Sequence, residues 1–388
     1  MSREKIFKLI FVIYLILLCA FVFTSLDALV SLNISIVPQF SQMGSCLLAI
    51  SLVLFSSNKG ANEFYILFLW WMAYYTIAYF LAPHYDIGVT GYFRLTWFIN
   101  AFLISYICCR NIENPKKLIT VAFVTIIVIN MYFTYLNIFN RVVSVNIEEI
   151  GVSNIVFWSF CSIPAVFLIN NPLYRNTLIT IIAIICLFTM KRSAFIALLL
   201  ILFFYYLSSK RIKRKFVNNN KALVYAVCCI GLIVLVYKFQ DQFLEIWNRN
   251  VNRINSIQED RGSNRLTVWE DVINAFDYNS IAEWIIGNGM GSTLFKAKHT
   301  TAHNDFLTVL FEFGIVGVIF YIIFIVKVVK RMILFWKSYS EYTMCLVSSV
   351  IILLVVGNVG DMFTCYSYLA YIMILLGAIE ARVSIGKI

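Results

Sequence analysis

The sequence IGNGMGSTLFKAKHTTAHNDFLTVLFEFGIVGVIFY, from Ile286 to Tyr321, joins a polar turn to an apolar helix. Two of the three histidines in the 388-residue chain, His299 and His303, lie in its polar part. An apolar helix of this kind is long enough to cross a bilayer, and the polar residues come directly before it. We therefore interpret the stretch as a reactive site held at a membrane surface, with His303 at its centre.

The rest of the chain is rich in similar apolar segments. Hydrophobic residues make up 61% of the sequence and charged residues 13%. The apolar runs are about 17 to 22 residues long, which matches the roughly 30 Å hydrocarbon core of a bilayer. The predicted fold is an all-α, polytopic membrane helix bundle with twelve transmembrane helices: Ile6–Phe23, Ile36–Phe55, Phe64–Leu81, Gly91–Cys109, Leu118–Phe139, Val152–Ile169, Tyr174–Met190, Ser193–Leu207, Ala222–Tyr237, Phe306–Val326, Tyr342–Val356 and Met362–Ile379.

Two of these predictions have an alternative. Residues 174–207 would measure about 51 Å as a single helix, which is too long for one span without extreme tilt. Two short spans that meet at Lys191-Arg192 fit better. The first span follows basic residues, as a signal peptide would, but no small-residue cleavage site comes after it. We therefore expect it to remain as a transmembrane helix.

The basic residues predict the orientation of the bundle. With the amino terminus inside, 20 of the 31 Lys and Arg residues and 5 of the 20 acidic residues fall on the inner side. This distribution satisfies the positive-inside rule, so both termini are predicted to be cytoplasmic. The net charge of +11 is then a topology signal. We interpret the basic run Lys210–Lys215 as an anchor to anionic lipid and expect no nucleic-acid partner.

Cysteine spacing and known motifs exclude several kinds of site. The ten cysteines all lie in or at the ends of predicted spans, and none has CxxC spacing. Neither a disulfide framework nor a zinc site is indicated. The sequence contains no P-loop, HExxH or GxSxG motif. We therefore expect no metal and no cofactor.

One predicted soluble segment is long enough to carry chemistry, namely the outer loop before the tenth span. Within it, Leu266, Trp269, Ile273 and Phe276 recur every three or four residues. This spacing predicts an amphipathic helix over residues 264–276 that lies on the bundle or on the bilayer surface. The expected organisation is nine transmembrane helices, the outer loop and three further helices, in residues 1–238, 239–305 and 306–388.

The loop also contains GNGMGS, at residues 287–292. Its glycine spacing resembles a dinucleotide fingerprint. That motif requires a preceding strand and a surrounding βαβ unit, and neither is predicted here. A flexible turn is therefore the expected structure.

The predicted topology brings polar residues from distant parts of the chain to the outer face. An arginine within membrane depth costs a few kcal/mol, so it normally faces a partner or an aqueous cavity and marks a functional site. Arg192 could instead snorkel to the interface or pair with carbonyls at the end of the seventh helix. Arg94 could pair with Asp86. The candidate site residues at this face are Arg94, Arg192, Arg265, His299, His303, Asn304 and Asp361.

The two outer histidines also have a purely structural reading. His303 could begin a helix and bond to Asp305, and His299 could be a solvated loop residue beside Lys298. The functional reading rests on the combination with arginine. Guanidinium groups bind phosphate through two hydrogen bonds and stabilise charge on a leaving diphosphate. A histidine can take a proton from an attacking hydroxyl near neutral pH. Together these groups suit glycosyl transfer from a lipid diphosphate.

Several motifs resemble the Wzy/WaaL-type superfamily of O-antigen polymerases and ligases. They are Lys191-Arg192-Ser193 at a helix start, SNRLTVW (263–269), IIGNGMG (285–291), AHNDFL (302–307) and EFGIVG (312–317), with looser matches at GNVGD (357–361) and GYFR (91–94). The recognisable motifs cover about residues 190–317. Many members have Ser-Arg-Gly where this chain has Lys-Arg-Ser.

The resemblance implies a bacterial integral membrane glycosyltransferase of the GT-C type. The functional trio of that family falls here on Arg192, Arg265 and His303. Arg94 would assist in diphosphate binding, and Asn304, His299 and Asp361 would support the site. The implied location is the bacterial inner membrane, with the active site on the periplasmic side.

The implied reaction is an inverting, metal-independent transfer from an undecaprenyl-diphosphate-linked oligosaccharide to a glycan acceptor. Polymerase and ligase share it and differ in acceptor, which is another lipid-linked repeat unit or lipid A-core. The AHNDFL wording favours the polymerase, for which a chain-length regulator would be a further partner. A flippase of lipid-linked sugars is the alternative outside enzymes. It predicts charged or broken helices near the bilayer midplane, whereas the polar residues here concentrate in one outer loop.

Overall fold

The computed structural model describes residues 2–31, 37–56, 62–81, 88–139, 155–188, 192–211, 265–297, 302–338, 340–359 and 366–386. Within these stretches every regular element is a helix, and none is a strand. The all-α fold predicted from the sequence is therefore confirmed for the described part of the chain. Its elements are α1 (Arg3–Ser31), α2 (Val37–Phe55), α3 (Glu63–Leu81), α4 (Gly88–Asn111), α5 (Pro115–Phe139), α6 (Ile155–Phe160), α7 (Ile163–Val166), α8 (Pro172–Phe188), α9 (Arg192–Arg211), α12 (Arg265–Ala275), η2 (Phe276–Tyr278), α13 (Ile281–Ile286), α14 (Ser292–Lys296), α15 (Asp305–Ser338), α16 (Thr343–Ile351), η3 (Ile352–Val356), α17 (Gly357–Val359) and α18 (Tyr366–Ser384).

Hydropathy supports a multi-pass membrane protein. By length and composition, the described residues contain five helices that could cross a membrane, in α1, α3, α4, α5 and α15. Shorter apolar helices lie in α2, α6–α7, α8, α9 and α16–η3. The ninth predicted span, residues 222–237, lies outside the described residues. The count of twelve spans is thus not confirmed, although helices occupy the other eleven predicted positions.

The seventh and eighth predicted spans are two helices. α8 ends at Phe188, α9 begins at Arg192, and the two pack against each other. The alternative of one long helix over residues 174–207 is therefore excluded.

The sixth predicted span, residues 152–169, is not one helix. α6 ends at Phe160, and α7 begins at Ile163 with Pro164 in its first turn. Proline lacks a backbone N–H, and its ring clashes with the carbonyl four residues earlier, which here belongs to Phe160. The chain therefore turns at Cys161 and Ser162, where Ser162 N donates to Ser159 O at 3.0 Å. Hydropathy gives no signal for Pro164, because a proline can break a helix without interrupting the apolar run.

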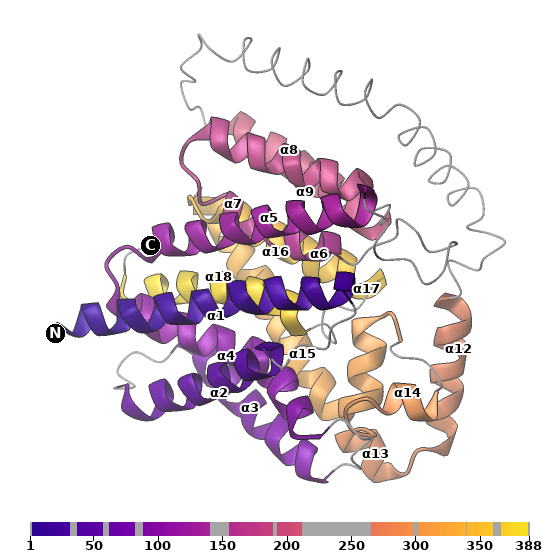
Figure 1. Cartoon of the computed structure of the whole chain (residues 1–388). Coiled ribbons are helices and arrows are strands. Elements are labelled where there is room, and N and C mark those ends of the chain that lie inside the picture. The colour runs from indigo at the N-terminus through magenta and orange to yellow at the C-terminus, as the bar shows by residue number, and fades with distance from the viewer. Residues whose placement is uncertain are drawn as a thin grey trace.

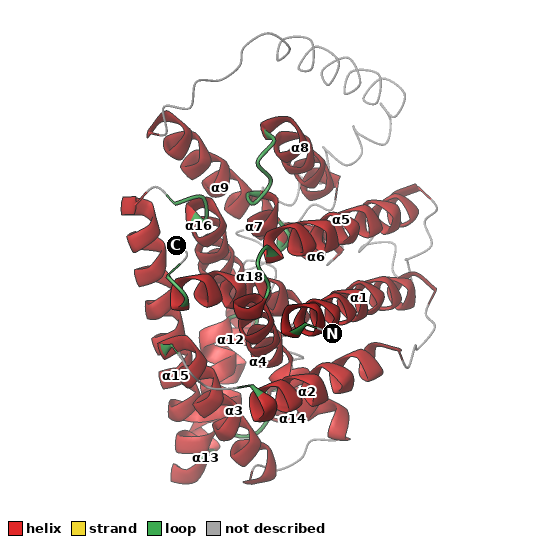
Figure 2. Ribbon diagram, turned by 90° about the vertical axis from the view of Figure 1, so that its left-hand side faces the viewer, coloured by secondary structure: helices red, strands yellow, loops and turns green. Residues whose placement is uncertain are grey.

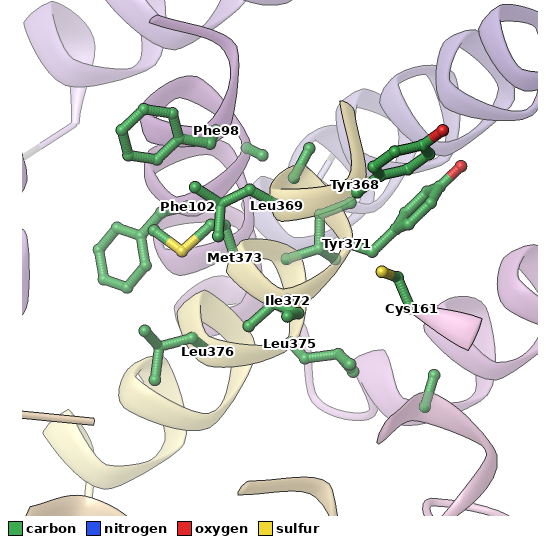
Figure 3. Close-up of a cluster of buried hydrophobic side chains, with 14 of the residues drawn as sticks. Phe98, Phe102, Cys161, Tyr368, Leu369, Tyr371, Ile372, Met373, Leu375 and Leu376 are labelled. Atoms are coloured by element: carbon green, nitrogen blue, oxygen red, sulfur yellow. The ribbon is translucent and has the colours of Figure 1, made fainter. Parts of the chain in front are cut away.

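The bundle is built around α4 and α18, which lie in the middle of Figure 2. Their backbones approach closely at Gly377, where a Cβ atom would lie 2.6 Å from Phe102 O. Nearby, Ser105 Oγ donates to Ile374 O at 2.6 Å. Figure 3 shows Phe98 and Phe102 of α4 beside the apolar side chains of α18. Large apolar residues on the outer helices, such as Trp70 on α3, are instead exposed.

Ionic contacts gather at one end of the bundle, which we call the ion-pair end. Lys327 of α15 pairs with Glu63 at the start of α3, and Lys116 pairs with Glu341 at 2.6 Å. Arg331 Nε lies 2.6 Å from Glu380 Oε1. These residues belong to the set that the charge distribution predicts for one membrane face. In Figure 1, α1 begins and α18 ends at this end, while α12, α13 and α14 lie at the other.

Candidate functional site

The end of the bundle opposite the ion-pair end carries a small helical subdomain with its own core. We call residues 265–297 and 302–313 the site subdomain. The ring of Phe276 stacks on Trp284 at 4.8 Å between centroids and meets Phe311 edge-on at 5.0 Å. The buried apolar residues of this core are Val268, Val272, Ala275, Phe276, Ala297, Ala302 and Phe311. Residues from the predicted loop and from the start of α15 therefore form one folded unit.

A kink in α15 joins this subdomain to the bundle. Gly314 has φ 62° and ψ −168°, and Gly287, which ends α13, has φ 87° and ψ 172°. Both conformations lie in a region of backbone space that is essentially restricted to glycine. A Cβ atom on Gly314 would lie 2.5 Å from Gly287 N, and one on Gly287 would overlap the backbone of Glu312. The two glycines thus allow two backbones to touch, and we call this contact the glycine clamp.

The kink leaves α15 carbonyls without their usual helical donors, and the glycine-rich turn supplies new ones. Asn288 binds Phe311 O twice, from its backbone N at 2.9 Å and from Nδ2 at 3.0 Å. Gly289 N donates to Glu312 O at 3.0 Å. The buried Glu312 side chain accepts from Thr293 Oγ1 at 2.9 Å. GNGMG and EFG are therefore hydrogen bonded to each other. The predicted turn at GNGMGS is present, and it is packed against α15.

Tyr74 extends the same contact to α3. Its hydroxyl donates to Phe313 O and, at 3.2 Å, to Ile286 O. One phenol thus binds both sides of the glycine clamp. The sequence gives no local signal for this role, because Tyr74 lies in an aromatic-rich transmembrane segment.

A charged network fixes α13 and α14 onto the clamp. Lys296 Nζ lies 2.6 Å from Glu283 Oε1 and also donates to Asn288 Oδ1. Glu283 further forms a capping box with Ser280 at the start of α13. The hydrogen bond from Lys296, followed by that from the backbone of Ser280, lowers the pKa of Glu283 to about 2. The carboxylate therefore stays ionised throughout the neutral range.

This pKa predicts how the network responds to pH. A carboxyl group with a lowered folded-state pKa stabilises the fold fully above its unfolded pKa and loses this effect as the pH falls through about 2. We expect the thermal stability of the site subdomain to be constant from about pH 5 to 8. Glu283→Gln should lower it by no more than about 1 kcal/mol, because the pair is partly exposed to solvent. A stability midpoint between these pH values that disappears in Glu283→Gln would contradict this assignment.

His303 lies in a short segment that is fixed on both sides. Its φ is 50°, and it is the one residue other than glycine with a positive φ among those described. Trp269 Nε1 of α12 donates to Ala302 O at 2.8 Å. On the other side, Asn304 Oδ1 accepts from Leu307 N at 3.0 Å and so caps the start of α15. A left-handed histidine costs about 1–3 kcal/mol and persists only where its surroundings enforce it.

The residues after His303 pack against the turn that follows η3. Asp305 is 1% exposed, and a Cβ atom on Gly357 would lie 3.3 Å from its Cγ. Asn304 Nδ2 donates to Asn358 O at 3.4 Å. A side chain at position 357 would displace this buried carboxylate. AHNDFL and the first three residues of GNVGD are therefore in direct contact.

The two arginines of the predicted trio lie on helices that join this assembly. Arg265 is half-buried and begins α12, one turn before Trp269 on the same face of that helix. Arg192 begins α9, which packs against η3, and the next residue, Ser193, is buried. The side chain of Arg192 is not among those described. Trp269 thus links α12 to the residue before His303, and η3, which α9 contacts, leads directly to Gly357.

The other predicted site residues are placed less directly. Arg94 lies in the second turn of α4, and its side chain is exposed. His299 and Asp361 lie outside the described residues, as does Asp86, the proposed partner of Arg94. Asn304 is the supporting residue whose position is defined, as a helix cap.

The helix predicted over residues 264–276 is confirmed, but of its four predicted apolar residues Phe276 is buried and Trp269 is half-buried, whereas the other two are exposed. α12 buries Val268, Val272 and Ala275, whereas Leu266 is 47% exposed and Ile273 is 56% exposed. Both sets recur at helical spacing, so periodicity alone could not choose between them. The hydrogen bond from the half-buried Trp269 to Ala302 O fixes the orientation of the helix.

Sequence reasoning also missed several residues of this assembly. Asn288, Glu312 and Gly314 lie within the motifs but have no role predicted from them, and Thr293 and Tyr74 lie outside the motifs. The available signal was the polar pair Thr293 and Glu312, because a glutamate inside an apolar segment usually has a partner. Among the described residues, no group of three His, Cys, Asp or Glu side chains could hold a metal ion.

A comparison with family models gives one match. The model described as O-antigen ligase matches residues 177–322. This region begins within α8, ends beyond the α15 kink, and includes Arg192, Arg265, His303 and both clamp glycines. No curated protein matches the chain.

Proposed function

Since residues 177–322 place the chain in the superfamily of O-antigen ligases and polymerases, we propose that it is a membrane glycosyltransferase acting on a lipid-diphosphate-linked glycan. The observation that carries this proposal is the enforced left-handed conformation of His303 at the point where Trp269, Asn304 and Asn358 meet. Strained residues of this kind gather at active sites.

In the proposed reaction, an acceptor hydroxyl attacks the anomeric carbon of the donor sugar. His303 takes the hydroxyl proton as the new carbon–oxygen bond forms. The bond between the anomeric carbon and the diphosphate oxygen breaks on the opposite side, which inverts the configuration. Arg192 and Arg265 hold the departing undecaprenyl diphosphate. The active site would face the periplasm of a bacterium, with both termini in the cytoplasm.

The choice between polymerase and ligase depends on the acceptor. The wording of AHNDFL favours a polymerase that joins lipid-linked repeat units, and the description of the matched family favours a ligase that transfers polymer to lipid A-core. We propose the polymerase as the first candidate. The glycan profile of a deletion strain separates the two. A single repeat unit on the core indicates a polymerase, whereas bare core with accumulated lipid-linked polymer indicates a ligase. An unchanged profile would contradict both.

Conservative substitution of the arginines should reveal a diphosphate clamp. Lysine keeps the charge, but it lacks the planar fork that binds two phosphate oxygens. The loss of one charge-assisted hydrogen bond of about 1.5–3 kcal/mol corresponds to roughly 10- to 150-fold in rate. We expect Arg192→Lys and Arg265→Lys each to lose product formation to this extent at matched membrane levels.

The same experiment tests the structural alternative for Arg192. If this residue only anchors a helix end at the interface, lysine should snorkel equally well and product formation should persist. Activity of Arg192→Lys within about threefold of wild type, a difference of less than 1 kcal/mol, would favour the anchor. Diphosphate binding would then depend on Arg265 and Arg94.

Removal of divalent ions should leave the purified enzyme active. The described residues offer no metal-ligating cluster, and the arginines supply the positive charge that a metal ion would otherwise provide. We expect equal rates with a chelator and with added Mg2+ or Mn2+. Strict dependence on an added divalent ion would overturn the proposed role of the arginines.

A further inference from the structure

We propose that the exposed face of η2 and α13 is embedded among lipid acyl chains in the leaflet nearer the site end of the bundle. This lipid-contacting face consists of Tyr278, Ile281, Trp284 and Ile285. It belongs to a segment that hydropathy places in a soluble loop. The inference concerns how the site subdomain sits on the membrane and does not depend on the reaction proposed above.

The four side chains are unusually exposed for apolar residues. Tyr278 is 88% exposed, Ile281 81%, Ile285 47% and Trp284 38%. Trp284 and Ile285 follow Ile281 by three and four residues, so all three side chains share one face of α13. Contiguous exposed apolar surface marks a contact with another molecule or with a membrane.

The position of α13 along the bundle identifies that environment. Tyr74 donates to Ile286 O, and it follows Glu63 by 11 residues, about 17 Å along α3. Gly314 contacts Ile285 and precedes Lys327 by 13 residues, about 20 Å along α15. Glu63 and Lys327 pair with each other at the ion-pair end. A tilted helix reaches less deep into the bilayer than its own length, so these lengths are upper limits on the depth of α13. If the hydrocarbon core, roughly 30 Å thick, starts near the Glu63–Lys327 pair, α13 lies within it.

The neighbouring surfaces are apolar as well. On α3, Trp70 is 67% exposed and Ile77 is 55% exposed. On α15, Ile315 is 47% exposed and Ile319 is 50% exposed, directly beyond the kink. Because α13 contacts both helices, its exposed face continues the exposed apolar surface of two helices that are long enough to cross a membrane.

The polar groups at the two ends of α13 are paired, as a lipid environment requires, whereas the buried side-chain amide of Asn279 just before it has no hydrogen-bond partner. The capping box formed by Ser280 and Glu283 binds the start of α13, and Lys296 neutralises Glu283. Glu283 lies on the face of α13 opposite Ile281, so this partly exposed ion pair points away from the acyl chains. At the other end, Gly287 N donates to Glu283 O, and the glycine-rich turn is buried against α15. Non-helical backbone at membrane depth is tolerated where protein covers it in this way. Tyr278 and Trp284 are also the residue types enriched where bilayer meets water.

The test places a fluorescent amino acid at Ile281, or at Glu270 as the control, in the full chain reconstituted in nanodiscs. Glu270 lies in the same subdomain, on α12, and is exposed. Fluorescence at Ile281 should be lost when the lipids carry a nitroxide on the acyl chain and should resist aqueous iodide. Fluorescence at Glu270 should show the reverse. A label at Ile319 on α15 provides the lipid-facing reference.

Two results would overturn the proposal. Equal iodide quenching at Ile281 and Glu270, without quenching by the lipid nitroxide, would place α13 in water. Shielding of Ile281 from both quenchers would mean that protein covers the face, either a second copy of this chain or another partner. The same measurement with the label at Ile285 shows whether a result at Ile281 reflects only a local disturbance.

Discussion

Gly314→Ala and Gly287→Ala should each abolish glycan product and unfold the site subdomain, while the helix bundle remains assembled. Alanine must leave a backbone conformation that is essentially restricted to glycine, at a cost of about 1–3 kcal/mol. Its Cβ atom must also displace backbone atoms across the glycine clamp. Backbone atoms cannot rotate away as a side chain can. Together these effects should reduce the stability of the site subdomain by about 3 kcal/mol or more.

Limited proteolysis and thermal unfolding of the purified protein measure this effect. Cleavage should become faster within residues 265–313 while the apparent size in detergent stays unchanged. Gly44→Ala in α2 is the matched control, because a Cβ atom there would make an ordinary contact of 4.0 Å with Leu17 Cδ1 of α1. It should retain normal product and stability. If either clamp variant behaved like Gly44→Ala, the glycine clamp would not hold the subdomain in place.

The clamp explains why part of this structure could not be predicted from sequence. Hydropathy correctly located the long helices, because a span leaves a continuous apolar signal. The contact between Gly287 and Gly314 leaves no such signal, since it depends on two φ angles and on the approach of segments 27 positions apart. A glycine inside a predicted span reads equally well as simple helix packing.

The candidate site likewise combines features that the sequence predicts with features that it does not. Motif order predicts that Arg265, His303 and Asn304 belong to one region, and the hydrogen bond from Trp269 connects α12 to the residue before His303. The sequence alone does not show which structural role each motif residue has. Asn304 is a helix cap, and Gly357 makes room for the carboxylate of Asp305. These roles depend on which turn meets which helix, and no local pattern encodes that.

His303→Ala should abolish product formation while the protein level in membranes stays normal. In the proposed mechanism, the change removes the proton acceptor, and general base catalysis typically contributes about 100- to 10,000-fold. It removes little packing, because the side chain is only half-buried. The comparison with His299→Ala tests the choice between the two histidines, and we expect the His299 variant to be milder. Equal losses in both variants would contradict the assignment of His303 as the proton acceptor.

Alanine also changes the backbone at this position, so a second variant must separate strain from chemistry. At φ 50°, alanine is disfavoured, whereas asparagine enters the left-handed region readily and can still form hydrogen bonds. Asparagine cannot act as a base. His303→Asn should therefore keep the thermal stability of wild type and still lose activity as severely as His303→Ala. If His303→Asn instead restored product close to the wild-type rate, the histidine would serve only to turn the chain into α15, and the proton acceptor would have to be sought elsewhere.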